Sequence, residues 1–176
     1  MAENESAPEN QQAAQDQQAH PGFAMQRIYV KDISFESPNS PVVFQKNWKP
    51  EVKMDLNTKN GQVGEGLYEV VVAVTLTATV DGMTAYIIEV QQAGIFQVQG
   101  FEGPQLGQAL GAFCPNLLFP YLRETIDNIL VKGSFPAMML GPVNFDAIYA
   151  QAMMQKQQEA AAAGAEAQGS GETPSH

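Results

Sequence analysis

The sequence has few of the residues that most active sites and metal sites need. Its one cysteine, Cys114, allows neither an intramolecular disulfide nor a thiolate metal cluster. Its two histidines, His20 and His176, lie in terminal segments that are poor in bulky apolar residues. We therefore expect no histidine base paired with a serine or cysteine nucleophile in the fold. No spacing of carboxylates indicates a metal site. We therefore predict that the chain is not an enzyme and that it needs neither a metal nor another cofactor.

Positive charge is also missing from a long central stretch. The formal net charge is −10, and no lysine or arginine occurs between Lys59 and Arg123. Five acidic residues fall in this stretch: Glu65, Glu69, Asp81, Glu89 and Glu102. A surface built from it would repel phosphate groups, so nucleic acid is not an expected partner. A basic protein segment would instead be attracted.

One uncharged segment is long enough to span a membrane, because residues 103–122 carry no formal charge. The segment contains three prolines and three glycines, and helix breakers at that density favour a buried helix with a broken start. The acidic first ten residues, MAENESAPEN, lack the features of a signal peptide. Together with the single cysteine, these observations predict a cytoplasmic protein without a stable membrane insertion.

Two groups of closely spaced glycines occur in the chain. The stretch GQVGEG at residues 61–66 is not followed by the Lys-Ser/Thr pair of a phosphate-binding loop, and it resembles a loose hairpin. Gly103, Gly107 and Gly111 lie four residues apart. We interpret this spacing as close packing of a helix or loop rather than as a special motif.

Composition divides the chain into one domain and two tails. Residues 1–24 and 159–176 are rich in small and polar residues and poor in large apolar ones. Such segments bury too little apolar surface to offset their ordering entropy, so both are predicted to be disordered. The domain is expected at residues 25–158, a length that can form one hydrophobic core.

The hydrophobic period within the domain is first two and then 3.6. Four strands are predicted at residues 26–36, 51–57, 67–80 and from residue 83 onward, the last two joined by a tight turn at Asp81-Gly82. A helix that ends at Gly133 and a last helix capped by Asn144 follow. This order predicts an α+β fold, a four-stranded antiparallel sheet with two C-terminal helices packed on one face.

The alternation also predicts which side chains face the core. The inward sets are Tyr29, Ile33 and Phe35 in the first strand, Val52, Met54 and Leu56 in the second, Tyr68, Val70, Val72, Val74 and Leu76 in the third, and Tyr86, Ile88 and Val90 in the fourth. The helix stripe is Leu118, Leu122, Ile126, Ile129 and Leu130, and the last helix carries Phe145, Ile148, Tyr149 and Met153.

The fourth strand keeps polar residues on its other face, where Ile87 lies beside Glu89 and Gln91. The first strand has a similar polar face with Asp32, Ser34 and Glu36. Such a face is either simply solvated or a docking surface with an apolar anchor, and the residues alone leave both possibilities open.

Five blocks carry a resemblance to a known family: RIYVKDISFE, VFQKNWKPEV, EVQQAGIFQVQG, CPNLLFPYLRE and PVNFDAIY. In this order and at this spacing they resemble the SecB protein-export chaperones over residues 25–158. The resemblance implies a cytoplasmic homotetramer, a dimer of dimers, that binds unfolded precursor polypeptides without ATP and passes them to the SecA ATPase.

The resemblance also implies roles for individual residues. By matching positions, Asp32, Glu36, Ile87 and Glu89 would form the acidic patch that docks the basic, zinc-binding C-terminal tail of SecA. Subunit association would be governed by Ile88, Val90 and Gln92. The client groove would use Phe44 and Trp48, with Phe145 and Tyr149 as further candidates, and core packing is the alternative for all four.

Two other functions are consistent with the same residues. One is a SecB-like chaperone dedicated to a single partner, and the other is a homo-oligomeric scaffold that binds no client. Preference for non-native chains would distinguish a chaperone from a scaffold.

Overall fold

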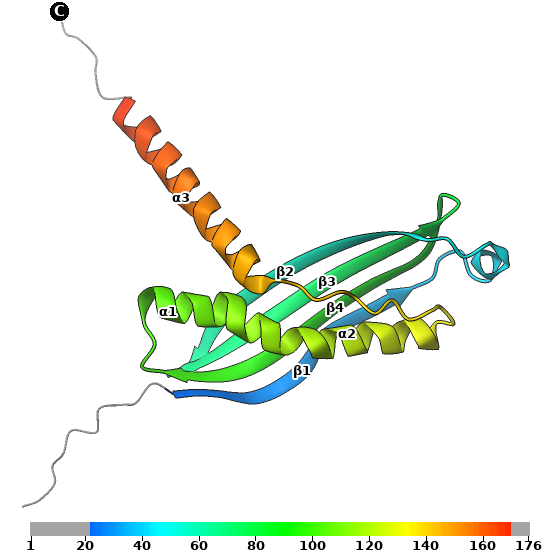
Figure 1. Ribbon diagram of the computed structural model, residues 1–176, viewed down its shortest axis with the longest axis horizontal. Coiled ribbons are helices and arrows are strands. Elements are labelled where there is room, and N and C mark those ends of the chain that lie inside the picture. The colour runs from blue at the N-terminus through cyan, green and yellow to red at the C-terminus, as the bar shows by residue number, and fades with distance from the viewer. Residues whose placement is uncertain (1–21, 170–176) are drawn as a thin grey trace, which may run out of the picture.

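The computed structural model describes residues 22–169 and confirms the predicted α+β class. Four antiparallel strands form one sheet in the order β1-β4-β3-β2, and a layer of helices lies on one side of it (Figure 1). The strands are β1 (Gly22–Glu36), β2 (Glu51–Gly64), β3 (Leu67–Val80) and β4 (Met83–Gln99). The helices are α1 (Gly103–Gln108), the π-helical turn η2 (Ala109–Phe113), α2 (Cys114–Lys132) and α3 (Phe145–Gly169), and a 3-10 turn, η1 (Val42–Gln45), lies in the loop after β1.

The central hairpin, β3 and β4, carries most of the sheet's core face. Its turn is at Asp81 and Gly82, as predicted, and both residues have positive φ, at 51° and 74°. This conformation matches the twist of a tight hairpin, and it favours Asp-Gly pairs. The predicted inward residues from Val70 to Leu76 and from Tyr86 to Val90 are at most 1% exposed.

Strand β1 differs from the prediction because it contains two register shifts, one between Met25 and Arg27 and one between Val30 and Asp32. Each shift inserts one extra residue and so reverses which positions face the core. Tyr29 pairs with Ala93 on the outer face, whereas Ile33 pairs with Val90 on the core face. The prediction that Tyr29 shares a face with Ile33 and Phe35 was therefore wrong.

Strand β2 forms the opposite edge of the sheet. The predicted inward residues Val52, Met54 and Leu56 pair with inward residues of β3. Only Leu56 packs against the core, while Val52 and Met54 are 39% and 46% exposed. Their exposure follows from their place at the edge, because α2 packs over the two central strands.

Helix α2 covers the middle of the sheet with the predicted apolar stripe. Four of the five predicted stripe residues are completely buried, namely Leu118, Leu122, Ile126 and Leu130, and Ile129 is partly buried. The helix approaches the backbone of β4 closely at Gly94, where an added Cβ would lie 2.9 Å from a methyl group of Leu118. Among residues 22–169, no helix combines the length and the apolar character needed to cross a membrane.

Helix α3 starts as predicted but leans away from the sheet (Figure 1). The Oδ1 atom of Asn144 accepts a hydrogen bond of 3.0 Å from the amide of Ala147, which confirms the N-cap. The helix packs against η2 rather than against the strands. It also continues to Gly169, through residues for which the composition predicts disorder. This run is rich in alanine, the residue with the highest helix propensity.

Candidate binding surfaces

The outer face of the sheet, which the helices leave uncovered, brings the four predicted docking residues together. Asp32 pairs with Gln91, and Glu36 pairs with Ile87 across the β1–β4 ladder. Ser34 lies opposite Glu89 in the same ladder. Residues paired directly across a ladder have Cβ atoms about 4.5–5.5 Å apart, so Glu36 lies beside Ile87, and the carboxylates of Glu89 and Asp32 follow in a row along the strands. We call Asp32, Glu36, Ile87 and Glu89 the acidic face.

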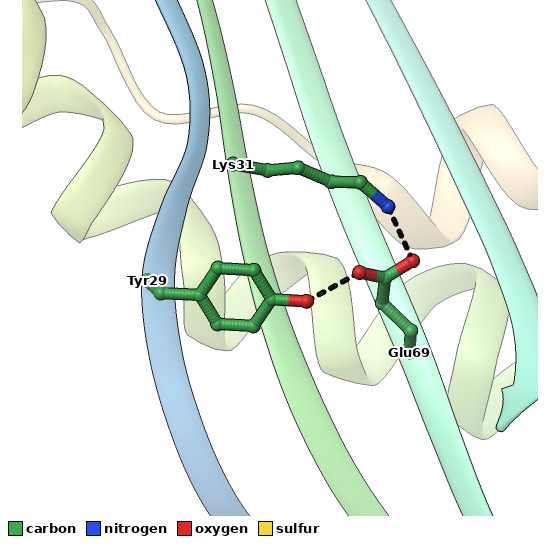
Figure 2. A network of polar contacts seen from close by, with 3 residues as sticks. All are labelled: Tyr29, Lys31 and Glu69. Carbon is green, nitrogen blue, oxygen red and sulfur yellow. Dashed lines mark hydrogen bonds and ion pairs between the residues drawn. The ribbon is translucent and has the colours of Figure 1, made fainter.

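A polar network lies farther along the same face and crosses from β1 to β3 (Figure 2). The Tyr29 hydroxyl donates a hydrogen bond to Oε1 of Glu69, and the Lys31 ammonium donates to Oε2 at 2.7 Å. The hydrogen bond to Glu69 raises the pKa of Tyr29 to about 12, with burial adding to the shift. The hydrogen bond from Lys31, which has the larger effect, and that from Tyr29 together hold the pKa of Glu69 below its usual value.

The residues with a predicted role in assembly lie on the opposite side of β4. Ile88 and Val90 are completely buried under the helical layer. Gln92 is 3% exposed, and its side-chain amide donates to the carbonyl oxygen of Tyr29 at 3.0 Å. Within residues 22–169 its Oε1 atom has no hydrogen-bond partner. Their role in subunit association stays a prediction, and it would have to act through the elements that cover them.

An aromatic cluster forms where the loop after β1 meets the end of α2. Phe135 lies at its centre, with ring centroids 5.2 Å from Phe44, 5.4 Å from Trp48 and 5.1 Å from Tyr86. A hollow of about 210 Å³ opens beside it, lined by Val43, Phe44, Lys46, Trp48, Ser134, Phe135 and Pro136. Phe44 is 49% exposed, so an apolar side chain is presented to solvent here. We call this site the aromatic hollow.

The other two predicted groove residues lie elsewhere. Phe145 is completely buried and packs edge-on against Phe119, with ring centroids 5.7 Å apart. Tyr149 packs over Gly107 and Gly111 at the start of the helical layer. This place is separated from the aromatic hollow by α2, whose 19 residues span roughly 28 Å. Phe145 is thus a core residue and Tyr149 lies outside the aromatic hollow, and a role of either residue in client binding stays a prediction.

Sequence reasoning missed two features of the apolar surface. Phe135 follows a helix end and has no periodic neighbours, so no pattern marks it. A second hollow of about 420 Å³ lies near the start of α3, where Phe23, Phe101 and Phe113 line it together with Asp146. Its aromatic residues come from β1, from the loop after β4 and from η2, and only the tertiary fold brings them together.

Two sequence interpretations concern possible chemistry. Cys114 is completely buried in the apolar core, and burial raises the pKa of its thiol to about 12. This is the environment of an inert thiol rather than of a nucleophile. Among residues 22–169, no three His, Cys, Asp or Glu side chains come together in an arrangement that could hold a metal ion.

Comparison with known proteins assigns the family. The family model described as preprotein translocase subunit SecB matches residues 16–156. The chain belongs to the SecB family. The protein-export protein SecB of Marinobacter nauticus is 64% identical over 154 residues, which are 87% of this chain and 93% of that protein. That of Hahella chejuensis is 58% identical over 167 residues, 95% of this chain and 99% of that protein.

A solved structure shows the same fold at low identity. It is the Mycobacterium tuberculosis Rv1957 SecB-like chaperone in complex with a ChAD peptide from the Rv1956 HigA1 antitoxin, with a TM-score of 0.53 and 12% identity. The match covers 69% of this chain and 87% of that chain. The identity to SecB proteins over most of the chain makes this a protein-export chaperone.

Proposed function

We propose that this SecB chain holds unfolded precursor polypeptides on the helical side of its sheet and delivers them to SecA at the acidic face. The observation that carries the proposal is the alternation of β4. Its even residues from Tyr86 to Val90 support the core under α2, while Ile87 and Glu89 point outward. One strand thus separates the two surfaces, and both can be occupied at once.

The aromatic hollow is the proposed entry point for a client side chain. It has an exposed ring, Phe44, beside a half-buried one, Trp48, and its volume suits a single large apolar side chain. Contacts to aromatic faces select for apolar character and not for a particular sequence, which agrees with broad selectivity. The exposed inner-face residues Val52 and Met54 of β2 offer further apolar contact.

The acidic face is the proposed SecA site. A tail that is basic is attracted by Asp32, Glu36 and Glu89, and Ile87 supplies an apolar anchor at one end of the patch. Charge complementarity of this kind raises association rates and excludes acidic partners. The delivered client and SecA would then be held on opposite sides of the same sheet.

The working form is proposed to be a cytoplasmic homotetramer that acts without ATP. An unfolded client loses roughly 0.5–1.5 kcal/mol for each side chain that it immobilises, so contact with one small hollow is weak. Several copies in one particle make later contacts intramolecular, and this raises avidity by about 10²–10⁴. Exposed apolar residues on both edge strands, such as Val30 and Val63, are available for contacts between copies.

Calorimetry tests the proposal with one exported protein in two forms, the precursor held unfolded and the folded mature form. We expect tight binding of the unfolded form alone. Binding of both forms, or of neither, would contradict a client role and leave a homo-oligomeric scaffold. Binding of SecA to the wild type and its loss in Glu89→Lys would support delivery to export rather than service to one dedicated partner.

A further inference from the structure

Lys31 is a cation placed next to a surface that is proposed to attract cations. It precedes Asp32 in β1 and is the extra residue of the register shift between Val30 and Asp32. Tyr29 is on the outer face, so alternation through Val30 places Lys31 on the outer face as well. The register shift then places Asp32 on the same face directly after Lys31, so the lysine lies beside the acidic face.

Glu69 fixes the position of this cation from two strands away. Its carboxylate reaches from β3 over β4 and binds the Lys31 ammonium at 2.7 Å, while its second oxygen accepts from Tyr29 (Figure 2). The bridge passes over β4 at Ala93 and Ile95, which pair with Tyr29 and Glu69. The Glu69 side chain is 21% exposed and that of Lys31 is 44% exposed. The carboxylate is thus held by two donors, whereas the lysine is mobile enough to turn elsewhere if it is released.

The direction in which Lys31 is held matters for the acidic face. Bound to Glu69, the ammonium lies over β4 and its charge is compensated. Released, it would be free to pair with Asp32, its neighbour in sequence and one of the three carboxylates of the acidic face. A basic partner would then compete with an internal cation for the same carboxylate.

We propose that Glu69 is a positioning residue of the acidic face, which keeps Lys31 away from Asp32 so that a basic partner segment meets uncompensated carboxylates. This inference rests on the proposed docking of the SecA tail at the acidic face. Glu69 itself need not touch the partner. Its effect is exerted through Lys31, and removal of Lys31 should make Glu69 dispensable.

The test is calorimetric titration of the full-length chain with the zinc-loaded SecA tail peptide at low and at high salt. Glu69→Gln should weaken binding by about fivefold at low salt, the upper end of what an exposed charge pair contributes, and by less at high salt. The double variant Lys31→Gln/Glu69→Gln should bind within about twofold of the wild type. Glu51→Gln is the matched control, because it removes one carboxylate from the outer face of β2 and leaves Lys31 paired.

The outcomes distinguish this inference from the proposed function. If Glu69→Gln binds like the wild type, or if the double variant remains as weak as Glu69→Gln, the positioning role is refuted. A loss in Glu51→Gln as large as that in Glu69→Gln would also refute it, because net charge would then suffice. If the wild-type chain does not bind the peptide, or Glu89→Lys binds as tightly as the wild type, docking at the acidic face itself is wrong. Thermal unfolding of each variant confirms that it is folded.

Discussion

The ring of Tyr149 occupies the space into which a side chain at Gly111 would project. An added Cβ at Gly111 would overlap the ring, and one at Gly107 would lie 2.5 Å from the Tyr149 hydroxyl. The glycines spaced four apart therefore form a seat for the first turns of α3, as the close-packing interpretation predicts for Gly107 and Gly111. Gly103 has open space around it and instead adopts a positive φ of 50°.

Gly111→Ala should loosen α3 from this seat. Overpacking costs about 1–3 kcal/mol and the helix-propensity gain of alanine offsets about 1 kcal/mol, so we expect a net destabilisation of up to about 2 kcal/mol. Urea unfolding measures it, and hydrogen exchange at the start of α3 should become faster. Gly61→Ala is the control, because nothing lies within 4 Å of the added methyl group. Equal stability of the two variants would contradict the seat.

Gln92→Glu should be tolerated at low pH and strongly destabilising at high pH. The introduced carboxyl would be buried, which raises its folded pKa above the unfolded value near 4.3. The cost of the substitution therefore grows as the pH rises above that value, to about 2–4 kcal/mol at pH 8. Urea unfolding at pH 5 and pH 8 measures the change. Gln97→Glu, on the outer face of the same strand, should show little pH-dependent loss, because Gln26 already donates a hydrogen bond to the side-chain oxygen at this position. A similar loss in both variants would count against burial of Gln92.

The Tyr29 hydroxyl should lose its proton at a higher pH than that of an ordinary tyrosine. Because its pKa is raised from 10.0 to about 12, the hydrogen bond to Glu69 stabilises the fold fully below pH 10 and is lost as the pH rises toward 12. The difference in phenolate absorbance between the wild type and Tyr29→Phe gives this titration. In Glu69→Gln the midpoint should fall toward 10, since the hydrogen bond to Glu69 is the largest cause of the shift. An unchanged midpoint would mean that burial dominates instead.

Trp48 is the chain's one tryptophan and lines the aromatic hollow, so its fluorescence should report client binding. An unfolded precursor that covers the half-buried indole should shift the emission to shorter wavelength. The SecA tail peptide should leave the spectrum unchanged, because the acidic face lies on the other side of the sheet. A shift with the SecA peptide, or none with a bound precursor, would place the client or SecA on a different surface.

The parts of the fold that sequence could predict are those where a local period decides burial. The alternation of β3 and β4 and the stripe of α2 gave the core faces correctly, since both elements lie in the centre of the sheet and its cover. The register shift at Lys31 was not predictable, because it depends on how β1 pairs with β4. The exposure of Met54 likewise follows from its strand's place at the edge.

Among the candidate sites, too, some residues could be predicted from local alternation and others only from the tertiary fold. The outward position of Ile87 and Glu89 follows from alternation alone, and the structure pairs Ile87 with Glu36 of β1. Their assignment to SecA came from family resemblance, and it stays a prediction. The aromatic hollow depends on Phe135. This residue contacts Phe44 and Trp48 only because the loop after β1 packs against the end of α2 in the folded chain.

Because β1 contains an extra residue at Lys31, the number of residues in this strand cannot change without moving side chains to the other face of the sheet. Just before Lys31 the even-numbered residues of β1 face the core, and after it the odd-numbered residues do, although both parts pair with the same strand. We expect many single substitutions in β1 to be accepted, whereas loss of one residue between Tyr29 and Asp32 would change which side chains reach each surface. Related chains could thus vary the chemistry of their outer face freely while the spacing along β1 stays fixed.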